Sequence, residues 1–282
     1  MEIFEHLDRS SLWAMSLVAA RFRAVATHNL YREPFLLNSR LSRLLASIKV
    51  NPFNAAIIKC IWVWLQSTCT PPETYNELFV LLTHTTNLER LYVSPVGYMN
   101  EVEWYPPPLP RLQILEFKKI RMSAQLAESL LALPELKCLK MGRVRCLSPV
   151  VTDLSPTSEH LITIMNNLVE FEGSTALTMY LRNYGKLKYL STGLCGLCEG
   201  MEEEWRFLLQ VAGATLQFLR VRGVDVDDCY QLLSRASRFS ALQFLGVVPL
   251  NVTEPSSTIV RHISFAVVAR IPTHLLIGRF RS

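Results

Sequence analysis

The chain has 282 residues, half of them apolar and 19% charged, with only 11 glycines and a formal net charge of +5. This composition excludes a disordered or collagen-like chain, and it is enough for a large core in one or two compact domains or in one elongated array. The positive charge is spread out, with no run of lysine and arginine and no basic stripe with interleaved aromatic residues, so the sequence does not indicate nucleic-acid binding.

Three short helices are predicted at the N-terminus. Residues 2–7 and 12–31 carry apolar side chains at spacings of three and four, and a polar break at residues 8–11 separates them. Ser10 or Ser11 can cap the helix after this break. Helices this short and apolar do not fold alone, so their faces must meet one another, the rest of the chain or a partner.

A short phrase, Leu-x-x-Leu/Phe-x-apolar, recurs through most of the remaining chain. It begins at Leu88, Leu112, Leu136, Leu168, Leu187, Leu216 and Leu242, with a plausible earlier unit at Ile58 and a degenerate last unit at Val260. The first leucines are on average about 26 residues apart, within the roughly 20–29 residues of a leucine-rich repeat. Alternating apolar positions within each phrase predict a short strand with one buried face.

Segments with helical spacing lie between the predicted strands, at residues 73–87, 123–134, 158–168, 201–213 and 227–239. Ser123 is a predicted cap for the second of these helices, and Pro134 lies beyond its end. Stacked strand–helix units predict an α/β solenoid with parallel strands inside and helices outside. We place a helical module at residues 1–45 and irregular repeats at 46–282. The repeats are irregular because the common Asn or Cys, eight residues after the first leucine, is replaced everywhere except at Cys195.

The sequence offers little support for catalysis. Cys195-Gly-Leu-Cys198 is the only CxxC, and without a second ligand pair we interpret it as structural. The histidines are isolated, and phosphate-binding or nucleophile-elbow motifs are absent. The glutamates near residues 199–204 are typical of a solvated helix start. We therefore predict that the chain is not an enzyme and has no cofactor and no metal; an enzyme on a repeat-like α/β fold is the more distant alternative.

Two tryptophans alternate with apolar residues on one predicted strand. Trp62 and Trp64 alternate with Ile61 and Val63, so one pair faces inward and the other faces outward or lies under a neighbouring unit. We favour core packing over a binding role for the tryptophans.

The segments "EIFEHLD", "SLWAMSLVAARFRAVA" and "LYRE" together resemble an F-box, a motif found at the start of substrate receptors. An F-box followed by leucine-rich repeats is a recognised arrangement, especially in fungi, and the two resemblances cover nearly the whole chain. The resemblance implies docking on the adaptor subunit of an SCF-type cullin–RING ubiquitin ligase, with the repeats holding a protein substrate for ubiquitin-dependent degradation. The matching adaptor-facing or helix-packing positions are Ile3, Phe4, Leu7, Leu12, Leu17, Val18, Phe22, Leu30 and Tyr31.

One feature of the family pattern is missing. An F-box opens with a Leu-Pro pair and further apolar residues before the "EIF", whereas this sequence starts at Met1-Glu2-Ile3. We expect either a truncated start or a degenerate F-box. The alternative function is therefore a leucine-rich-repeat interaction scaffold that no longer binds the ligase.

The non-apolar strand positions are predicted to project on the concave, strand-lined face of the solenoid, where a substrate would bind. They are Arg90, Tyr92, Glu116, Lys118, Lys140, Glu172, Ser191, Arg220 and Arg222. Their mixed charge suits a protein or phosphorylated peptide better than a nucleic acid; a merely solvated sheet surface is the other interpretation. Scattered cysteines, no secretory signal and no apolar stretch of membrane-spanning length predict a protein of the cytoplasm or nucleus, away from membranes.

Overall fold

The computed structural model describes residues 8–18, 20–65, 72–95, 105–121, 124–145, 163–164, 166–174, 186–193, 215–224, 240–249 and 265–267. The chain divides into two compact units, Met1–His160 and Leu161–Ser282. Both combine parallel strands in chain order with helical residues, so the fold is of the α/β class and compatible with a solenoid. No helix among the described residues has the length and apolar character needed to cross a membrane.

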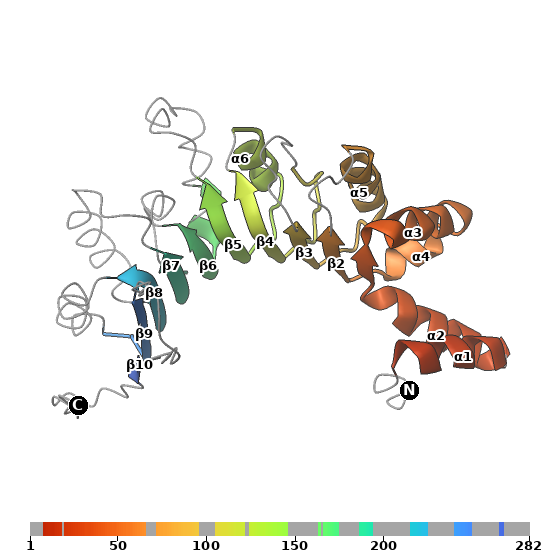
Figure 1. Ribbon diagram of the computed structural model, residues 1–282, viewed down its shortest axis with the longest axis horizontal. Coiled ribbons are helices and arrows are strands. Elements are labelled where there is room, and N and C mark those ends of the chain that lie inside the picture. The colour runs from red at the N-terminus through yellow and green to blue at the C-terminus, as the bar shows by residue number, and fades with distance from the viewer. Residues whose placement is uncertain are drawn as a thin grey trace, which may run out of the picture. The chain divides into compact units, whose positions relative to one another are not determined.

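The first unit begins with helices and continues as strands, most of which are separated by helices (Figure 1). Its helices are α1 (Arg9–Val18), α2 (Ala20–Arg32), α3 (Asn38–Val50), α4 (Phe53–Ile57), α5 (Pro72–His84) and α6 (Ala124–Leu131). Its strands are β1 (Phe35–Leu37), β2 (Cys60–Leu65), β3 (Arg90–Pro95), β4 (Ile114–Arg121) and β5 (Cys138–Arg145). Each strand pairs in parallel with the next one along the chain.

The core of this unit lies between the strands and their helices. Figure 1 shows α5 and α6 on the same side of strands β2 to β5. Leu78, Leu81 and Leu82 of α5 are fully buried, as are the apolar residues on one face of α6. The opposite face of the sheet carries the alternate strand residues. The predicted layering of strands and helices is therefore confirmed for these repeats.

Both leucine positions of the repeat phrase are buried in each of the seven repeats that begin at a leucine; the last unit, from Val260, begins outside the described residues. The buried first positions are Leu88, Leu112, Leu136, Leu168, Leu187, Leu216 and Leu242, and the buried fourth positions are Leu91, Leu115, Leu139, Phe171, Leu190, Leu219 and Leu245. The earlier unit at Ile58 follows the same pattern, because Ile58 and Ile61 are buried and Ile61 lies in register with Leu91. Full burial of such a side chain stabilises the fold by about 1.5–3 kcal/mol.

Backbone hydrogen bonds connect consecutive repeats without an asparagine ladder. The carbonyl of Lys59 accepts the N–H groups of Glu89 and Arg90 at 2.9 and 3.0 Å, and the carbonyl of Glu89 accepts those of Gln113 and Ile114 at 2.8 and 3.0 Å. The same pattern recurs at the carbonyls of Gln113, Val169, Lys188 and Gln217. At these six strand entries a backbone acceptor therefore pairs the donors of the next repeat, whatever side chain is present.

The second unit contains β6 (Glu170–Ser174), β7 (Tyr189–Gly193), β8 (Phe218–Val224), β9 (Phe244–Pro249) and β10 (Phe265–Val267). Strands β6 to β9 pair in parallel in chain order. Helical residues at 163–164 and 166–167 fall in the helix predicted at 158–168. Strand β10 pairs antiparallel with β9, which differs from the repeat expected from Val260 onward. A reversed strand cannot continue a parallel repeat.

The helical N-terminus differs from prediction in its cap. Asp8, rather than Ser10 or Ser11, caps α1, because its Oδ1 accepts the backbone N–H of Ser11 at 2.7 Å. Helices α1 and α2 pack against each other, and α2 contacts α4. Strand β1 already pairs with β2, and the predicted domain boundary at residue 45 falls inside α3. The boundary itself stays a prediction.

Candidate functional site

The predicted adaptor-facing residues divide into buried, exposed and undescribed positions. On α1, Leu12 is only 5% exposed and packs inside, whereas Leu17 is 59% exposed. On α2, Phe22, Leu30 and Tyr31 are half-buried. The hydroxyl of Tyr31 shares a 2.6 Å hydrogen bond with that of Ser47 on α3, which assigns Tyr31 a role in attaching α2. Positions whose side chains lie outside the described residues are Ile3, Phe4, Leu7 and Val18.

One exposed aromatic residue on α1 was not a predicted site residue. Trp13 is 62% exposed and lies four positions before Leu17, so both side chains lie on the same side of α1. The sequence could have revealed this site, because Trp13 and Leu17 are large apolar residues at i and i+4 that lie outside the apolar stripe of Leu12. The pair Trp13 and Leu17, here named the α1 apolar pair, is available for contact with a partner.

The outward face of the first unit's sheet carries an aromatic row that continues into charged residues. Trp62, Tyr92, Glu116 and Lys140 occupy equivalent positions in β2, β3, β4 and β5. The rings of Trp62 and Tyr92 stack with centroids 3.7 Å apart and planes 6° from parallel. Burial, as the first cause, raises the pKa of Tyr92. The predicted positions Tyr92, Glu116 and Lys140 therefore do share one face.

The tryptophans of β2 face away from the core, which corrects the interpretation that favoured core packing. Ile61 and Val63 are buried, whereas Trp62 is 41% exposed and Trp64 is half-buried. The Nζ of Lys118 lies 4.8 Å from the centre of a Trp64 ring, within cation–π range. The alternation along β2 did not decide which pair of residues faces the core. In the structure the smaller branched residues, Ile61 and Val63, fill the layer beneath the helices.

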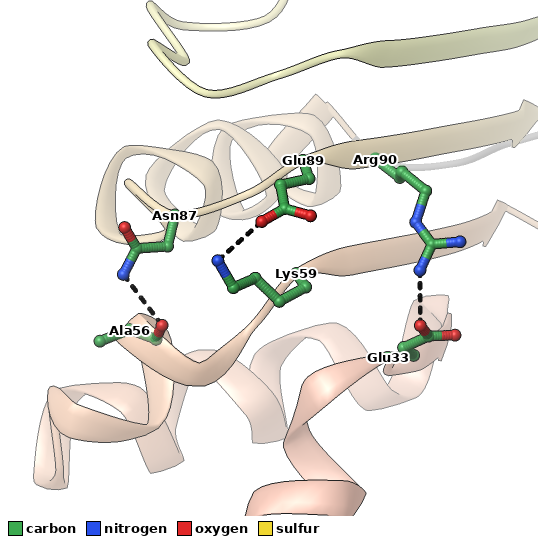
Figure 2. A network of polar contacts seen from close by, with 6 residues as sticks. All are labelled: Glu33, Ala56, Lys59, Asn87, Glu89 and Arg90. Atoms are coloured by element: carbon green, nitrogen blue, oxygen red, sulfur yellow. Dashed lines mark hydrogen bonds and ion pairs between the residues drawn. The ribbon is translucent and has the colours of Figure 1, made fainter.

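Arg90 is engaged in an ion pair at the beginning of β3. Its Nη2 lies 2.6 Å from Oε1 of Glu33, just after α2, as Figure 2 shows. A parallel contact joins Lys59 Nζ to Glu89 Oε1 at 2.7 Å, and Asn87 donates to the carbonyl of Ala56 at 3.0 Å. The hydrogen bond from Lys59, as the first cause, lowers the pKa of Glu89. These contacts join neighbouring segments within the first unit. Arg90 therefore has a structural contact, which competes with its predicted ligand-binding role.

In the second unit, the predicted positions Glu172, Ser191 and Arg220 lie in register on β6, β7 and β8. Ser191 is only 1% exposed, so its side chain is covered in this row, whereas Glu172 and Arg220 are partly exposed. Beside this row, Tyr189, Phe218 and Phe244 form a stack with 4.2 Å between successive ring centroids. Arg222 belongs to β8, but its side chain is outside the described set.

Two observations describe the remaining chemical groups among the described residues. Burial raises the pKa of the Cys60 thiol to about 11, which disfavours the nucleophilic thiolate. Across the described ranges, no group of three or more His, Cys, Asp or Glu is placed to hold a metal ion. The predicted structural cysteines Cys195 and Cys198 lie outside those ranges. What the site supplies chemically is stacked aromatic rings beside ammonium and carboxylate groups.

Comparison with known proteins adds little to this description. No family model matches the sequence, and no curated protein matches it at a significant level. A crystal structure of a protein from Bacteroides fragilis, a Northeast Structural Genomics Consortium target, is similar at 14% sequence identity with a TM-score of 0.31. The similarity covers 67% of this chain and 64% of that one, so this chain spans just under two thirds of its length. A likeness this distant carries no argument about fold or function.

Proposed function

We propose that the chain is the substrate-recognition subunit of an SCF-type cullin–RING ubiquitin ligase. In this proposal α1 and α2 dock on the adaptor subunit, and the outward face of the repeat strands holds a protein substrate. The observation that carries the proposal is the α1 apolar pair, Trp13 and Leu17, exposed on a helical pair that directly precedes stacked leucine-rich units. Exposed large apolar residues on a helix fit a partner surface better than solvent.

In this role the chain does no chemistry of its own. It places a lysine of the substrate near the ubiquitin-charged enzyme that the ligase carries, and the rate gain comes from proximity. Contacts through Glu33 connect the helical pair to the strand face, which supports such a role. Arg9 Nη2 donates to the carbonyl of Glu33 at 2.6 Å, and the carboxylate of Glu33 holds Arg90 on β3.

Adaptor binding tests the proposal directly. We expect the purified adaptor subunit to be retained by the immobilised chain, and we expect Trp13→Ala and Leu17→Ala each to weaken binding by about tenfold, since buried aromatic and apolar anchors dominate interfaces. Val50→Ala is the matched control, because Val50 is an exposed apolar residue on α3. A second form of the chain carries an added upstream Leu-Pro helix. Lack of adaptor binding by both forms contradicts the proposal.

The alternative function is a repeat scaffold that binds a partner through its strand face and does not bind the ligase. The aromatic stack of Trp62 and Tyr92 favours it, because that stack lies within the repeats and does not depend on α1. The two functions differ in the adaptor experiment alone. If the adaptor binds but Trp13→Ala and Leu17→Ala have no effect, then docking through the α1 apolar pair is wrong, and so is the scaffold alternative.

A further inference from the structure

The outward face of β1 to β5 has an aromatic part and a cationic part. Phe35 lies in register with Trp62, and both are exposed, while Tyr92 stacks on Trp62. The cationic part lies on the next strands, with Lys118 on β4 and Lys140 on β5. We name this surface the aromatic–lysine strip and define it by Phe35, Trp62, Trp64, Tyr92, Lys118 and Lys140.

The ammonium groups of the strip lie on β4 and β5. Arg90 is already matched by Glu33, with 2.6 Å between their charged atoms. The other charged residues of this face whose side chains are described are Glu116, Lys118 and Lys140, which are one carboxylate and two ammonium groups. Lys118 is exposed and held above Trp64, so its ammonium group is positioned beside an aromatic surface.

The spacing of the two parts matches an extended peptide. Tyr92 and Lys140 lie in one row, two strands apart, which corresponds to about 10 Å at the usual distance between strands. In a polyproline II helix, residues i and i+3 lie on the same side, about 9 Å apart. A ring at one position of such a peptide and a carboxylate three residues later can therefore reach the aromatic and cationic parts together.

We propose that the aromatic–lysine strip binds an extended acidic peptide segment that carries a proline or aromatic ring three residues from a carboxylate. The inference rests on the proposed function and names the class of substrate segment for that same face. The ring packs on the stack of Trp62 and Tyr92, and the carboxylates meet Lys118 and Lys140.

A single-stranded nucleic acid is the main competitor, because bases also stack on aromatic side chains beside cations. The position of Glu116 argues against it. Glu116 lies between Tyr92 and Lys140 in the same row, and a polynucleotide carries a phosphate at each residue. A peptide can place an uncharged residue opposite Glu116 and its carboxylates elsewhere, so one acidic side chain on the strip discriminates between the two ligands.

The test measures binding of labelled peptides to the full chain by fluorescence anisotropy. The first probe is a proline-rich peptide of about ten residues with Phe followed three residues later by two Glu, long enough to cross the strip at about 3.1 Å per residue. The other probes replace Glu with Lys, replace Phe with Ala, or are oligo-uridine. We expect the first probe to bind best, Trp62→Ala to weaken it about tenfold, and Lys118→Glu to weaken it about fivefold.

Matched controls separate this inference from the proposed function. Phe53→Ala removes an exposed aromatic residue on α4, and Lys49→Glu reverses an exposed lysine on α3; both should leave peptide affinity unchanged. Because Lys118 is exposed, its reversal keeps the test valid even if Trp62→Ala fails to fold. Equal binding of the lysine probe, preference for oligo-uridine, insensitivity to Lys118→Glu, or no peptide binding overturns the inference. Adaptor binding, measured on the same variants, tests the proposed function independently of the peptide result.

Discussion

Asp8 holds the beginning of α1 through its carboxylate. Hydrogen bonds from Ser11, and then from Ser10, hold the pKa of the Asp8 carboxyl below its ordinary value of 3.8. The ionised form is therefore favoured in the folded chain, and its contribution is complete above the ordinary pKa and is lost as the pH falls through the lowered one. We expect Asp8→Asn, which can still cap, to reduce the acid sensitivity of α1, and Asp8→Ala to lose the cap at every pH.

Hydrogen exchange of the α1 amides as a function of pH measures this effect locally. Glu135→Gln is the control, because Glu135 is an exposed acid in the turn after α6. If Asp8→Asn retains the full loss of protection below about pH 4 shown by the unmodified chain, the carboxylate is not the group responsible.

Gly173 on β6 leaves space that the ring of Phe171 occupies. A Cβ built at Gly173 would lie 2.5 Å from Cζ of Phe171, whose side chain is fully buried. We expect Gly173→Ala to lower the free energy of unfolding by about 1–3 kcal/mol, because the buried ring must move. Chemical denaturation measures the loss.

The compensating change identifies the cause of that loss. In the background of Phe171→Leu, the smaller side chain should tolerate Ala at position 173, so the two substitutions should be less than additive. Simple additivity would show that the clash with Phe171 is not the reason for glycine.

Residue-level predictions succeeded where periodicity alone decides the outcome. The burial of Leu88, Leu91 and their equivalents followed from spacing, because a strand with one covered face has only one way to place alternating apolar residues. The orientation of Trp62 did not follow, since apolar residues occupy both faces of β2. The pairing of Arg90 with Glu33 could not be found either, because it joins positions far apart in the sequence.

At the scale of elements, Glu33 fastens the helical pair to the first repeats. Its carboxylate pairs with Arg90 of β3, and its carbonyl accepts from Arg9 of α1. We expect Glu33→Gln to increase hydrogen exchange at the C-terminal end of α2, with a change in unfolding free energy below about 1 kcal/mol because both side chains are partly exposed. The effect should shrink at high salt, which screens such pairs.

The neighbouring pair of Lys59 and Glu89 provides the comparison for this prediction. Its side chains join two repeat units, and the backbone N–H of Lys59 separately donates to the carbonyl of Arg32 in α2 at 2.9 Å. Glu89→Gln leaves that backbone bond in place, so it should leave exchange of α2 unchanged. Equal loosening of α2 in Glu33→Gln and Glu89→Gln would mean that the helical pair is not held by Glu33.

Helices and strands were easier to predict from the sequence when their apolar periodicity extended over more residues. The predicted helices at residues 73–87 and 123–134 correspond to α5 and α6, because each carries an apolar stripe over several turns. Strand β1 has only three residues and gave no periodic signal. The antiparallel direction of β10 depends on its pairing with β9, and a strand's own sequence does not encode its direction.

At the scale of the whole molecule, the stacking of repeats determines how far a local loss of stability extends along the chain. Leu91, Leu115 and Leu139 form one buried row across β3, β4 and β5. Truncation of the central residue in Leu115→Ala removes packing for both neighbours, so we expect a loss of about 2–5 kcal/mol in unfolding free energy. Leu17→Ala, at an exposed position, should change it by less than about 0.5 kcal/mol.

Because a solenoid unit contacts only its neighbours, hydrogen exchange distinguishes stacked units from a single globular core. Leu115→Ala should weaken amide protection in β3 and β5 together with β4, and should weaken it less in β1, which pairs only with β2. Protection lost in β4 alone would show that the row of leucines does not couple the units. Protection lost equally throughout β1 to β5 would show one cooperative core, in which the repeats of the sequence no longer correspond to separate units of stability.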